Sequence, residues 1–164
     1  MWNYRDPNVE RVMRHIKNFP NKRVARILSH KMATPLRSSQ ARSYAGHRKI
    51  VIIPIPIGRA RFRTRGYNQS LLLARPLAKI TYQKLLTNIL IKSKQTKKQG
   101  TAKNKTERVH NIAGSFKVQH ARLIKNKTIL LVDDITTTGT TLYEARKILL
   151  ESGARDVIAV TVAN

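Results

Sequence analysis

Residues 129–141, with the sequence Ile-Leu-Leu-Val-Asp-Asp-Ile-Thr-Thr-Thr-Gly-Thr-Thr, constrain the fold of this chain more than any other stretch. The four apolar residues at its start predict a short buried strand, because a strand covered on both faces needs no polar alternation. From Thr140 the spacing becomes helical, and one face of that helix carries Leu142, Ala145, Ile148 and Leu149. The segment therefore predicts a strand, two carboxylates at its carboxyl end, a hydroxyl-rich turn and the N-terminus of a helix.

The turn between this strand and this helix has the chemistry of a site for a phosphorylated sugar. Backbone N–H groups and the helix dipole favour a phosphate at such a turn, and threonine hydroxyls can donate to its oxygens. The preceding acids, Asp133 and Asp134, can accept hydrogen bonds from the hydroxyls of a ribose. The residues predicted to bind the phosphate are Thr136, Thr137, Thr138, Gly139, Thr140 and Thr141.

Two other interpretations of this segment remain open. A hydrophobic run that ends in Asp-Asp also resembles the magnesium-binding strand of P-loop nucleotide hydrolases, but the sequence contains no G-x-x-x-x-G-K-[ST] motif. The segment is also compatible with an ordinary strand–turn–helix connection in which the threonines act as caps. Its length and order favour a phosphate site over this second alternative.

A second segment combines a strand with a cluster of arginines. Residues 51–53 predict a core strand that ends at Pro54-Ile55-Pro56, because proline cannot donate to a sheet ladder. Residues 58–70 follow, with arginines at alternate positions between two glycines. We expect these guanidinium groups to face oxyanions, although an exposed basic loop would have the same composition. In the helix expected next, Pro76 predicts a kink or an early break.

Both segments resemble known families. Residues 129–141 resemble the phosphoribosyl pyrophosphate (PRPP) loop of type I phosphoribosyltransferases, in which the paired acids hold the ribose hydroxyls and the turn holds the 5′-phosphate. The Pro-x-Pro strand end, the arginines and the sequence Arg-Gly-Tyr-Asn-Gln resemble the ComF family, whose phosphoribosyltransferase-like members are associated with DNA uptake in competent bacteria. The resemblance implies that Arg59, Arg63 and Arg65 bind the diphosphate.

A lysine-rich segment, residues 94–105, is predicted by its composition to be a mobile loop. Gln99, Arg108 and Asn111 in and after it match the ComF pattern, but Thr101 and Ala102 stand where the family commonly has leucine. The resemblance implies that a loop in this region closes over the diphosphate and excludes water. A solvated loop without such a role would have the same sequence character.

The order of the predicted elements indicates an α/β fold with a mainly parallel sheet flanked by helices, and the resemblance implies that it is the type I phosphoribosyltransferase fold. Strand 129–132, helix 140–152 and strand 157–162 form a right-handed βαβ unit, which makes the two strands parallel. Short strands are expected at 89–91 and 116–118. We expect residues 1–46 to form a helical lead-in or cap, with helices from Pro7 and from Lys22 and a loop from Thr34, and residues 47–164 to form the phosphoribosyltransferase-like domain.

The charge of the chain is strongly positive, with 33 basic and 8 acidic residues and a formal net charge of +25. Such a surface attracts polyanions, with nucleic acid first and a polyphosphate substrate or an anionic membrane next. A generally basic proteome would also explain it. We expect the positive field to keep Asp133 and Asp134 ionised.

The absence of cysteine rules out disulfides and thiolate metal sites, and the sequence lacks the cysteine-rich zinc module that ComF proteins often carry at the N-terminus. The sequence shows no apolar run long enough to span a membrane and no signal peptide, so we expect a soluble, cytoplasmic protein.

The resemblance implies binding of PRPP, or of a related ribose 5-phosphate compound, with Mg²⁺ held through the substrate. A nucleophile would then displace diphosphate at C1 of the ribose. Asp133 and Asp134 are the candidate catalytic residues, acting by positioning and electrostatics. The alternatives are a non-catalytic accessory that binds single-stranded DNA and a PRPP-sensing regulator. Besides PRPP, the partners to test are single-stranded DNA, a competence helicase and a second copy of the chain.

Overall fold

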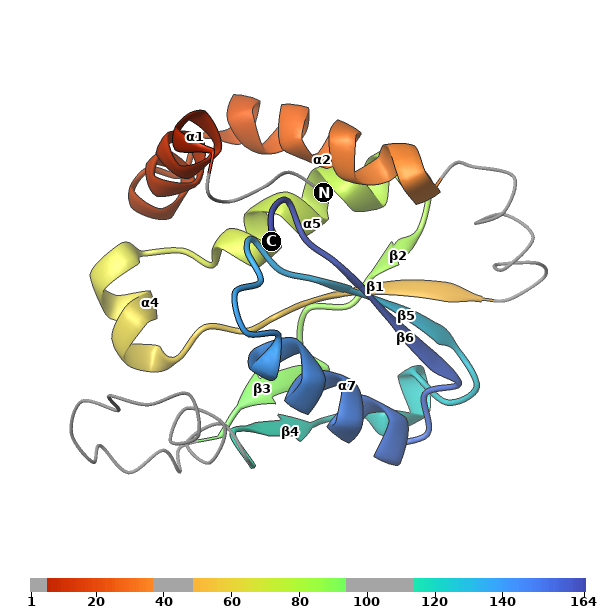
Figure 1. The fold of residues 1–164 in the computed structure, drawn as a ribbon. Coiled ribbons are helices and arrows are strands. Elements are labelled where there is room, and N and C mark those ends of the chain that lie inside the picture. Colours follow the sequence, from red (N-terminus) through yellow and green to blue (C-terminus); the bar gives the residue numbers. More distant parts are fainter. Residues whose placement is uncertain (1–5, 37–48, 94–113) are drawn as a thin grey trace.

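A parallel sheet of four strands forms the centre of the molecule (Figure 1). The computed structural model describes residues 6–36, 49–93 and 114–164. The strand order is β2-β1-β5-β6, with β2 at Lys84–Leu85, β1 at Ile50–Pro54, β5 at Thr128–Val132 and β6 at Asp156–Val160. Pro54, the last residue of β1, lies opposite Val132, the last residue of β5. The carboxyl ends of these two strands therefore meet at one edge of the sheet, and the predicted mainly parallel α/β fold is confirmed.

One face of this sheet is covered by α7 (Thr140–Glu151) and by a separate antiparallel pair, β3 (Leu90–Lys92) and β4 (Phe116–Val118) (Figure 1). A short 3₁₀ turn, η1 (Ala121–Leu123), precedes β5. Ala145 and Leu149 of α7 are buried, and Leu142 and Ile148 pack against the same hydrophobic cluster. The predicted apolar face of this helix and the predicted βαβ unit are confirmed, and β6 pairs with β5 in parallel.

Three helices cover the opposite face: α5 (Gln69–Thr81) with α2 (Lys22–Leu36) and α1 (Pro7–Asn18) (Figure 1). Met13 and Ile16 of α1 are fully buried in the hydrophobic cluster that also contains Ile52 of β1. Ser29 of α2 donates through its hydroxyl to the backbone carbonyl of Leu73 in α5 at 2.8 Å. The N-terminal helices thus share a core with the sheet. The predicted domain boundary after residue 46 lies outside the described residues and stays a prediction.

The helix boundaries correct two expectations and decide one open alternative. The predicted loop from Thr34 begins too early, because α2 continues through Pro35 to Leu36. The predicted early break at Pro76 is wrong: α5 runs on to Thr81, and Leu73, Ala74, Leu77 and Ala78 around the proline are all buried. Arg59–Arg65 forms a helix, α4, and not the exposed basic loop that its composition also allowed. Within the described ranges, no helix is long and apolar enough to cross a membrane.

Candidate functional site

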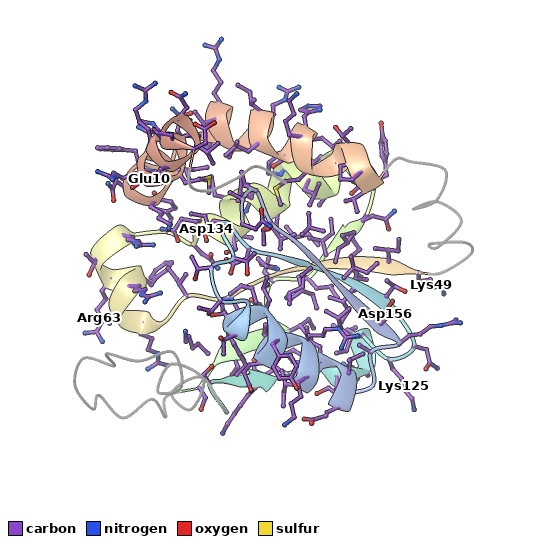
Figure 2. The ribbon with its side chains drawn as sticks, viewed as in Figure 1. Glu10, Lys49, Arg63, Lys125, Asp134 and Asp156 are labelled. Carbon is purple, nitrogen blue, oxygen red and sulfur yellow. The ribbon has the colours of Figure 1, made fainter. Side chains whose placement is uncertain are left out.

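The two acids of the 129–141 segment lie at the carboxyl edge of the sheet, directly after β5. The backbone N–H of Ile55 donates to the carbonyl of Val132 at 2.8 Å, and the N–H of Asp133 donates to Val160 at 3.1 Å. These bonds hold the start of the acidic turn between the ends of β1 and β6. Asp134 lies at the opposite end of the sheet from Asp156 (Figure 2). The structure therefore brings the Pro-x-Pro strand end and the paired acids together, as expected for ligand binding beyond the carboxyl ends of parallel strands.

The Asp133 carboxylate faces α5 and is held by two donors. Ser70 Oγ donates to Asp133 Oδ1 at 2.8 Å, and the backbone N–H of Asp134 donates to the same oxygen at 2.9 Å. Burial raises the pKa of Asp133 to about 7, and the neighbouring Asp134 charge adds to the rise, while the Ser70 bond opposes it. The expectation that both acids are kept ionised is therefore wrong for Asp133. Desolvation outweighs the positive net charge of the chain, because most of that charge lies in solvent.

Removing the Ser70 hydroxyl tests this arrangement. Ser70→Ala takes away a donor that favours the ionised carboxylate, so we expect the pKa of Asp133 to rise further above 7. Carbon-13 NMR of the aspartate carboxyl groups between pH 5 and pH 9 measures this pKa. Ser29→Ala is the matched control, because Ser29 is buried but bonds to the carbonyls of Ala25 and Leu73. A Ser70→Ala midpoint at or below that of the wild type would show that the bond does not hold the carboxylate.

The threonine turn leads into the start of α7, where the sequence predicts a phosphate site. Gly139 takes the left-handed conformation (φ 71°) and precedes the first helical residue, Thr140. No side chain caps α7 at this N-terminus, so the N–H groups of its first turn can point at a ligand anion. Thr138 Oγ1 and Thr140 Oγ1 lie 3.0 Å apart and share a hydrogen bond. Carboxylates, hydroxyls and an uncapped helix N-terminus thus follow one another within a single short turn.

The Arg-Gly-Tyr-Asn-Gln sequence lies at the junction of α4 and α5, and its polar side chains connect elements. Tyr67 donates its hydroxyl to the carbonyl of Ile16 in α1 at 2.7 Å, and Gln69 Nε2 donates to the carbonyl of Lys17 at 3.3 Å. Asn68 accepts from the N–H of Ser70 at 3.0 Å and donates to the carbonyl of Ile55 at 2.9 Å. This sequence therefore fixes α5, and with it Ser70, against the end of β1.

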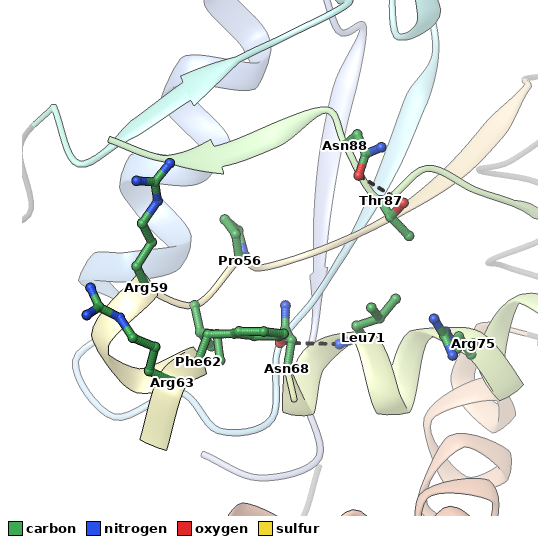
Figure 3. A pocket seen from close by; sticks show the side chains of 10 residues that line it. Pro56, Arg59, Phe62, Arg63, Asn68, Leu71, Arg75, Thr87 and Asn88 are labelled. Atoms are coloured by element: carbon green, nitrogen blue, oxygen red, sulfur yellow. Dashed lines mark hydrogen bonds between the residues drawn. The ribbon is translucent and has the colours of Figure 1, made fainter. Parts of the chain in front are cut away.

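The helical form of α4 separates the four arginines that alternate in the sequence. Residues four apart share a helix face, and Arg59 and Arg63 line one pocket together with Phe62 (Figure 3). Arg61 acts on another group, Lys92, whose pKa it lowers in addition to the larger effect of burial. Burial raises the pKa of Tyr67, and the Arg65 charge partly offsets that rise. The predicted trio Arg59, Arg63 and Arg65 is thus divided between environments, and its diphosphate role stays a prediction.

Lys92 is a site residue that the sequence did not single out. It ends β3, and a Cβ added at Gly58 would lie 3.8 Å from its Cδ, so its stem runs beside the loop after β1. Its Nζ lies 5.5 Å from the centroid of the Phe116 ring. Burial and the charge of Arg61 lower its pKa, whereas Asp133 acts in the opposite direction. Lys92 therefore places a cation beside the loop after β1, and its pKa responds to the charges of both Arg61 and Asp133.

The remaining predicted site residues, Gln99, Arg108 and Asn111, lie outside the described residues. The sequence analysis missed Lys92 and Ser70. Their place at the site depends on contacts with distant segments, which local sequence patterns do not show. Ser70 had one local indication: it directly follows the Arg-Gly-Tyr-Asn-Gln sequence. Lys92 is one of many lysines and had none.

Comparison with known proteins adds a family match. The model of the phosphoribosyl transferase domain matches residues 67–164. Competence protein ComFC of Bacillus subtilis (strain 168) is 34% identical over 103 residues, which cover 63% of this chain and 39% of that protein. DNA utilization protein YhgH of Escherichia coli O157:H7 is 29% identical over 106 residues, covering 65% of this chain and 45% of that protein. The chain thus spans less than half the length of these two relatives.

A solved structure supports the fold. Glutamine PRPP amidotransferase from B. subtilis, complexed with ADP and GMP, aligns with a TM-score of 0.55 and 18% sequence identity. The alignment covers 92% of this chain and 30% of that one. At this identity the likeness shows a shared fold.

Proposed function

Because the chain belongs to the phosphoribosyltransferase domain family, as a ComF-type member, we propose that it binds PRPP at the carboxyl edge of its sheet. One observation carries this proposal: two carboxylates follow β5 and lead through a threonine turn into an uncapped helix N-terminus. The 5′-phosphate occupies the turn 136–141, where N–H groups and hydroxyls converge. The ribose hydroxyls donate to Asp133 and Asp134.

The diphosphate of PRPP requires positive charge at the same edge. We assign Lys92 to it, because its ammonium lies within the electrostatic reach of Asp133. An anion beside Lys92 offsets the desolvation that lowers its pKa. The arginines Arg59, Arg63 and Arg65 of α4, and the loop residues Gln99, Arg108 and Asn111, remain further candidates for this end of the ligand.

Mg²⁺ fits this site as part of the bound substrate. The described residues contain no group of three or more histidine, cysteine, aspartate or glutamate side chains that could hold a metal ion. Mg²⁺ keeps octahedral geometry and binds well through one or two carboxylates together with phosphate oxygens and water. Oxygens of the diphosphate and water would hold the ion, and Asp133 and Asp134 would remain with the ribose hydroxyls. The ion neutralises charge on the leaving diphosphate when it is bound.

The proposed reaction exchanges one bond at C1 of the ribose for another. A nucleophile, usually nitrogen, forms the new bond to C1, while the bond from C1 to the diphosphate oxygen breaks and its electrons leave with diphosphate. The proton of the nucleophile passes to solvent or to the diphosphate. Asp133 and Asp134 position the ribose and stabilise the positive charge that develops on it, and Lys92 stabilises the leaving group.

A role in DNA uptake is part of the proposal, because relatives of this chain are named for competence and for DNA utilization. The net charge of +25 favours a second candidate function, a non-catalytic accessory that binds single-stranded DNA. A regulator that senses PRPP would bind both PRPP and nucleic acid, and PRPP would then change the affinity for nucleic acid by linkage. A competence helicase, a second copy of the chain and a cytoplasmic location belong to these proposals as well.

Two assays separate the candidates. An enzyme releases diphosphate from PRPP in the presence of an acceptor, and we expect Asp134→Asn to abolish that release. Asp156→Asn is the matched control, because Asp156 lies at the other end of the sheet (Figure 2). A DNA-binding accessory instead binds single strands with a steep dependence on salt concentration and releases no diphosphate. Diphosphate release by Asp134→Asn at the rate of the wild type would contradict the proposed site.

A further inference from the structure

A pocket of about 510 Å³ lies between α4, the N-terminal half of α5 and the turn from β2 to β3 (Figure 3). Its walls combine apolar groups, among them Pro56, Phe62 and Leu71, with guanidinium groups. Two of its ten lining residues, Arg59 and Arg63, are also candidates for the diphosphate of PRPP, and none is assigned to the ribose or to its 5′-phosphate. The other eight lining residues have no role in the proposed PRPP site, and they make the pocket a feature of its own in the described part of the chain.

The orientation of α5 separates this pocket from the acidic site. Ser70 points at Asp133 and is buried, whereas Leu71 and Arg75, which are four residues apart, face the pocket. The two sites thus lie against neighbouring faces of one helix. A ligand in the pocket contacts α5 through Leu71 and Arg75 and leaves the Ser70–Asp133 bond intact.

The charge of the pocket indicates an anionic ligand. Three arginines line it, Arg59, Arg63 and Arg75, and no lining residue is acidic. Both ion pairs found between described residues lie elsewhere, at Arg14–Glu10 and Arg146–Asp156. Guanidinium groups that share a concave site without a carboxylate match the oxygens of a phosphate.

The apolar and amide groups narrow the ligand further. Phe62 is 51% exposed and lines the pocket from α4, the helix that also carries Arg59 and Arg63 (Figure 3). Thr87 donates its hydroxyl to the side-chain oxygen of Asn88 at 3.3 Å, which brings an amide to the opposite wall. An aromatic ring beside arginines accepts a base by stacking and its phosphate by charge. We infer that this pocket binds a nucleotide, with its phosphate at the arginines and its base against Phe62.

The bound nucleotide could be a free mononucleotide or one nucleotide of a single strand, because both carry a base and a phosphate. The experiment is a calorimetric titration of the full chain with dAMP, with deoxyribose 5-phosphate, which lacks a base, and with a single-stranded hexanucleotide. The inference predicts saturable binding of dAMP. Binding of the hexanucleotide more tightly than dAMP identifies the strand as the source, and equal or weaker binding identifies the free nucleotide.

Variants separate this site from the one proposed for PRPP. We expect Arg75→Ala to weaken dAMP binding about tenfold through the loss of a charge-assisted hydrogen bond. Phe62→Leu should weaken dAMP by about five- to tenfold through lost stacking and leave deoxyribose 5-phosphate unchanged. Arg155→Ala is the control, because it removes the same charge at an exposed position where β6 begins.

Asp133→Asn should remove PRPP binding and leave dAMP binding intact, so failure of either site is visible separately. Equal losses of dAMP affinity in Arg75→Ala and Arg155→Ala would show that dAMP responds only to the net charge of the chain, and would overturn the inference. Loss of PRPP binding in Arg75→Ala without loss of dAMP binding would overturn it as well.

Discussion

Asp133→Asn is expected to weaken PRPP binding by at least about 100-fold, because the ribose loses charge-assisted hydrogen bonds to a carboxylate. The same variant should be more stable than the wild type at pH 8. The asparagine oxygen can still accept from Ser70 and from the N–H of Asp134, which bond to Asp133 Oδ1 in the wild type. Calorimetry with PRPP and Mg²⁺ measures the first effect, and urea unfolding measures the second.

The sign of the stability effect follows from the raised pKa. Folding raises the pKa of Asp133 from 3.8 to about 7, so between these values the folded chain holds a proton that the unfolded chain has lost. The free energy of unfolding therefore falls as the pH rises from about 4 to about 7, and the loss is complete above pH 7. We expect the free energy of unfolding of Asp133→Asn to exceed that of the wild type by about 1–3 kcal/mol at pH 8 and by almost nothing at pH 4. This range is smaller than the pKa shift alone would give, because part of the side chain reaches solvent.

Ligand binding should show the opposite pH dependence. The ionised Asp133 accepts more strongly from ribose hydroxyls, so the affinity of the wild type for PRPP should rise between pH 6 and pH 8 with a midpoint near 7. The variant should show no such midpoint. Equal stability of both proteins at pH 8, together with unchanged PRPP affinity, would contradict the role assigned to this carboxyl group.

Thr140→Asp is expected to abolish binding of the 5′-phosphate while slightly stabilising the fold. A carboxylate at the first turn of α7 interacts favourably with the helix dipole by about 0.3–1 kcal/mol. In the same position it repels a phosphate dianion, so we expect a loss of PRPP affinity of more than about 100-fold. Ribose 5-phosphate, which lacks the diphosphate, should lose affinity as well. Calorimetry and thermal unfolding measure the two effects.

Thr140→Val is the matched control for this substitution. Thr140→Val removes the hydrogen bond that Thr140 shares with Thr138 and adds no charge, so the excess loss in Thr140→Asp reports the added charge. We expect the valine variant to lose affinity by about three- to tenfold, the value of one hydrogen bond. Similar affinities of the two variants would place the phosphate away from the start of α7.

The predictable parts of the fold are those in which local pattern and packing agree. The first helix was predicted to start at Pro7, and Asp6 before it caps that start by accepting from the N–H of Asn8 at 2.8 Å. The unbroken apolar run 129–132 forms four of the five buried residues of β5, and the helical spacing after Thr140 forms α7. In each case one short window contains both the cap or strand signal and the apolar face.

The errors arose where local signals were weak or where packing outweighed them. The sequence of Arg59–Arg65 was interpreted from its charges, but arginine, alanine and phenylalanine permit a helix, and Gly66 ends it in the left-handed conformation (φ 75°). Pro76 removes one hydrogen bond from α5, yet the burial of Leu73 and Leu77 stabilises the helix around it. The short edge strand β2 has only two residues and too little pattern to be predicted.

The site residues that are consecutive in the sequence could be predicted, whereas those that come from distant segments could be predicted only in part. Asp133, Asp134 and the turn 136–141 are consecutive, and the structure places them as the sequence indicates. Ser70 and Lys92 reach the same edge from other elements, and no local pattern encodes the Ser70–Asp133 bond. The ionisation of Asp133 was predicted wrongly for the same reason, because desolvation depends on what the fold packs around a side chain.

Calorimetric titration of the wild type and of the double variant Asp133→Asn/Asp134→Asn with PRPP and Mg²⁺ at pH 8 tests the proposed site most directly. The unfolding transition of each protein is recorded in the same buffer to show that both are folded. We predict saturable heat with a single site for the wild type and none for the double variant. Absence of heat from the folded wild type, or equal heat from the folded double variant, would contradict a PRPP site at the carboxyl edge of the sheet.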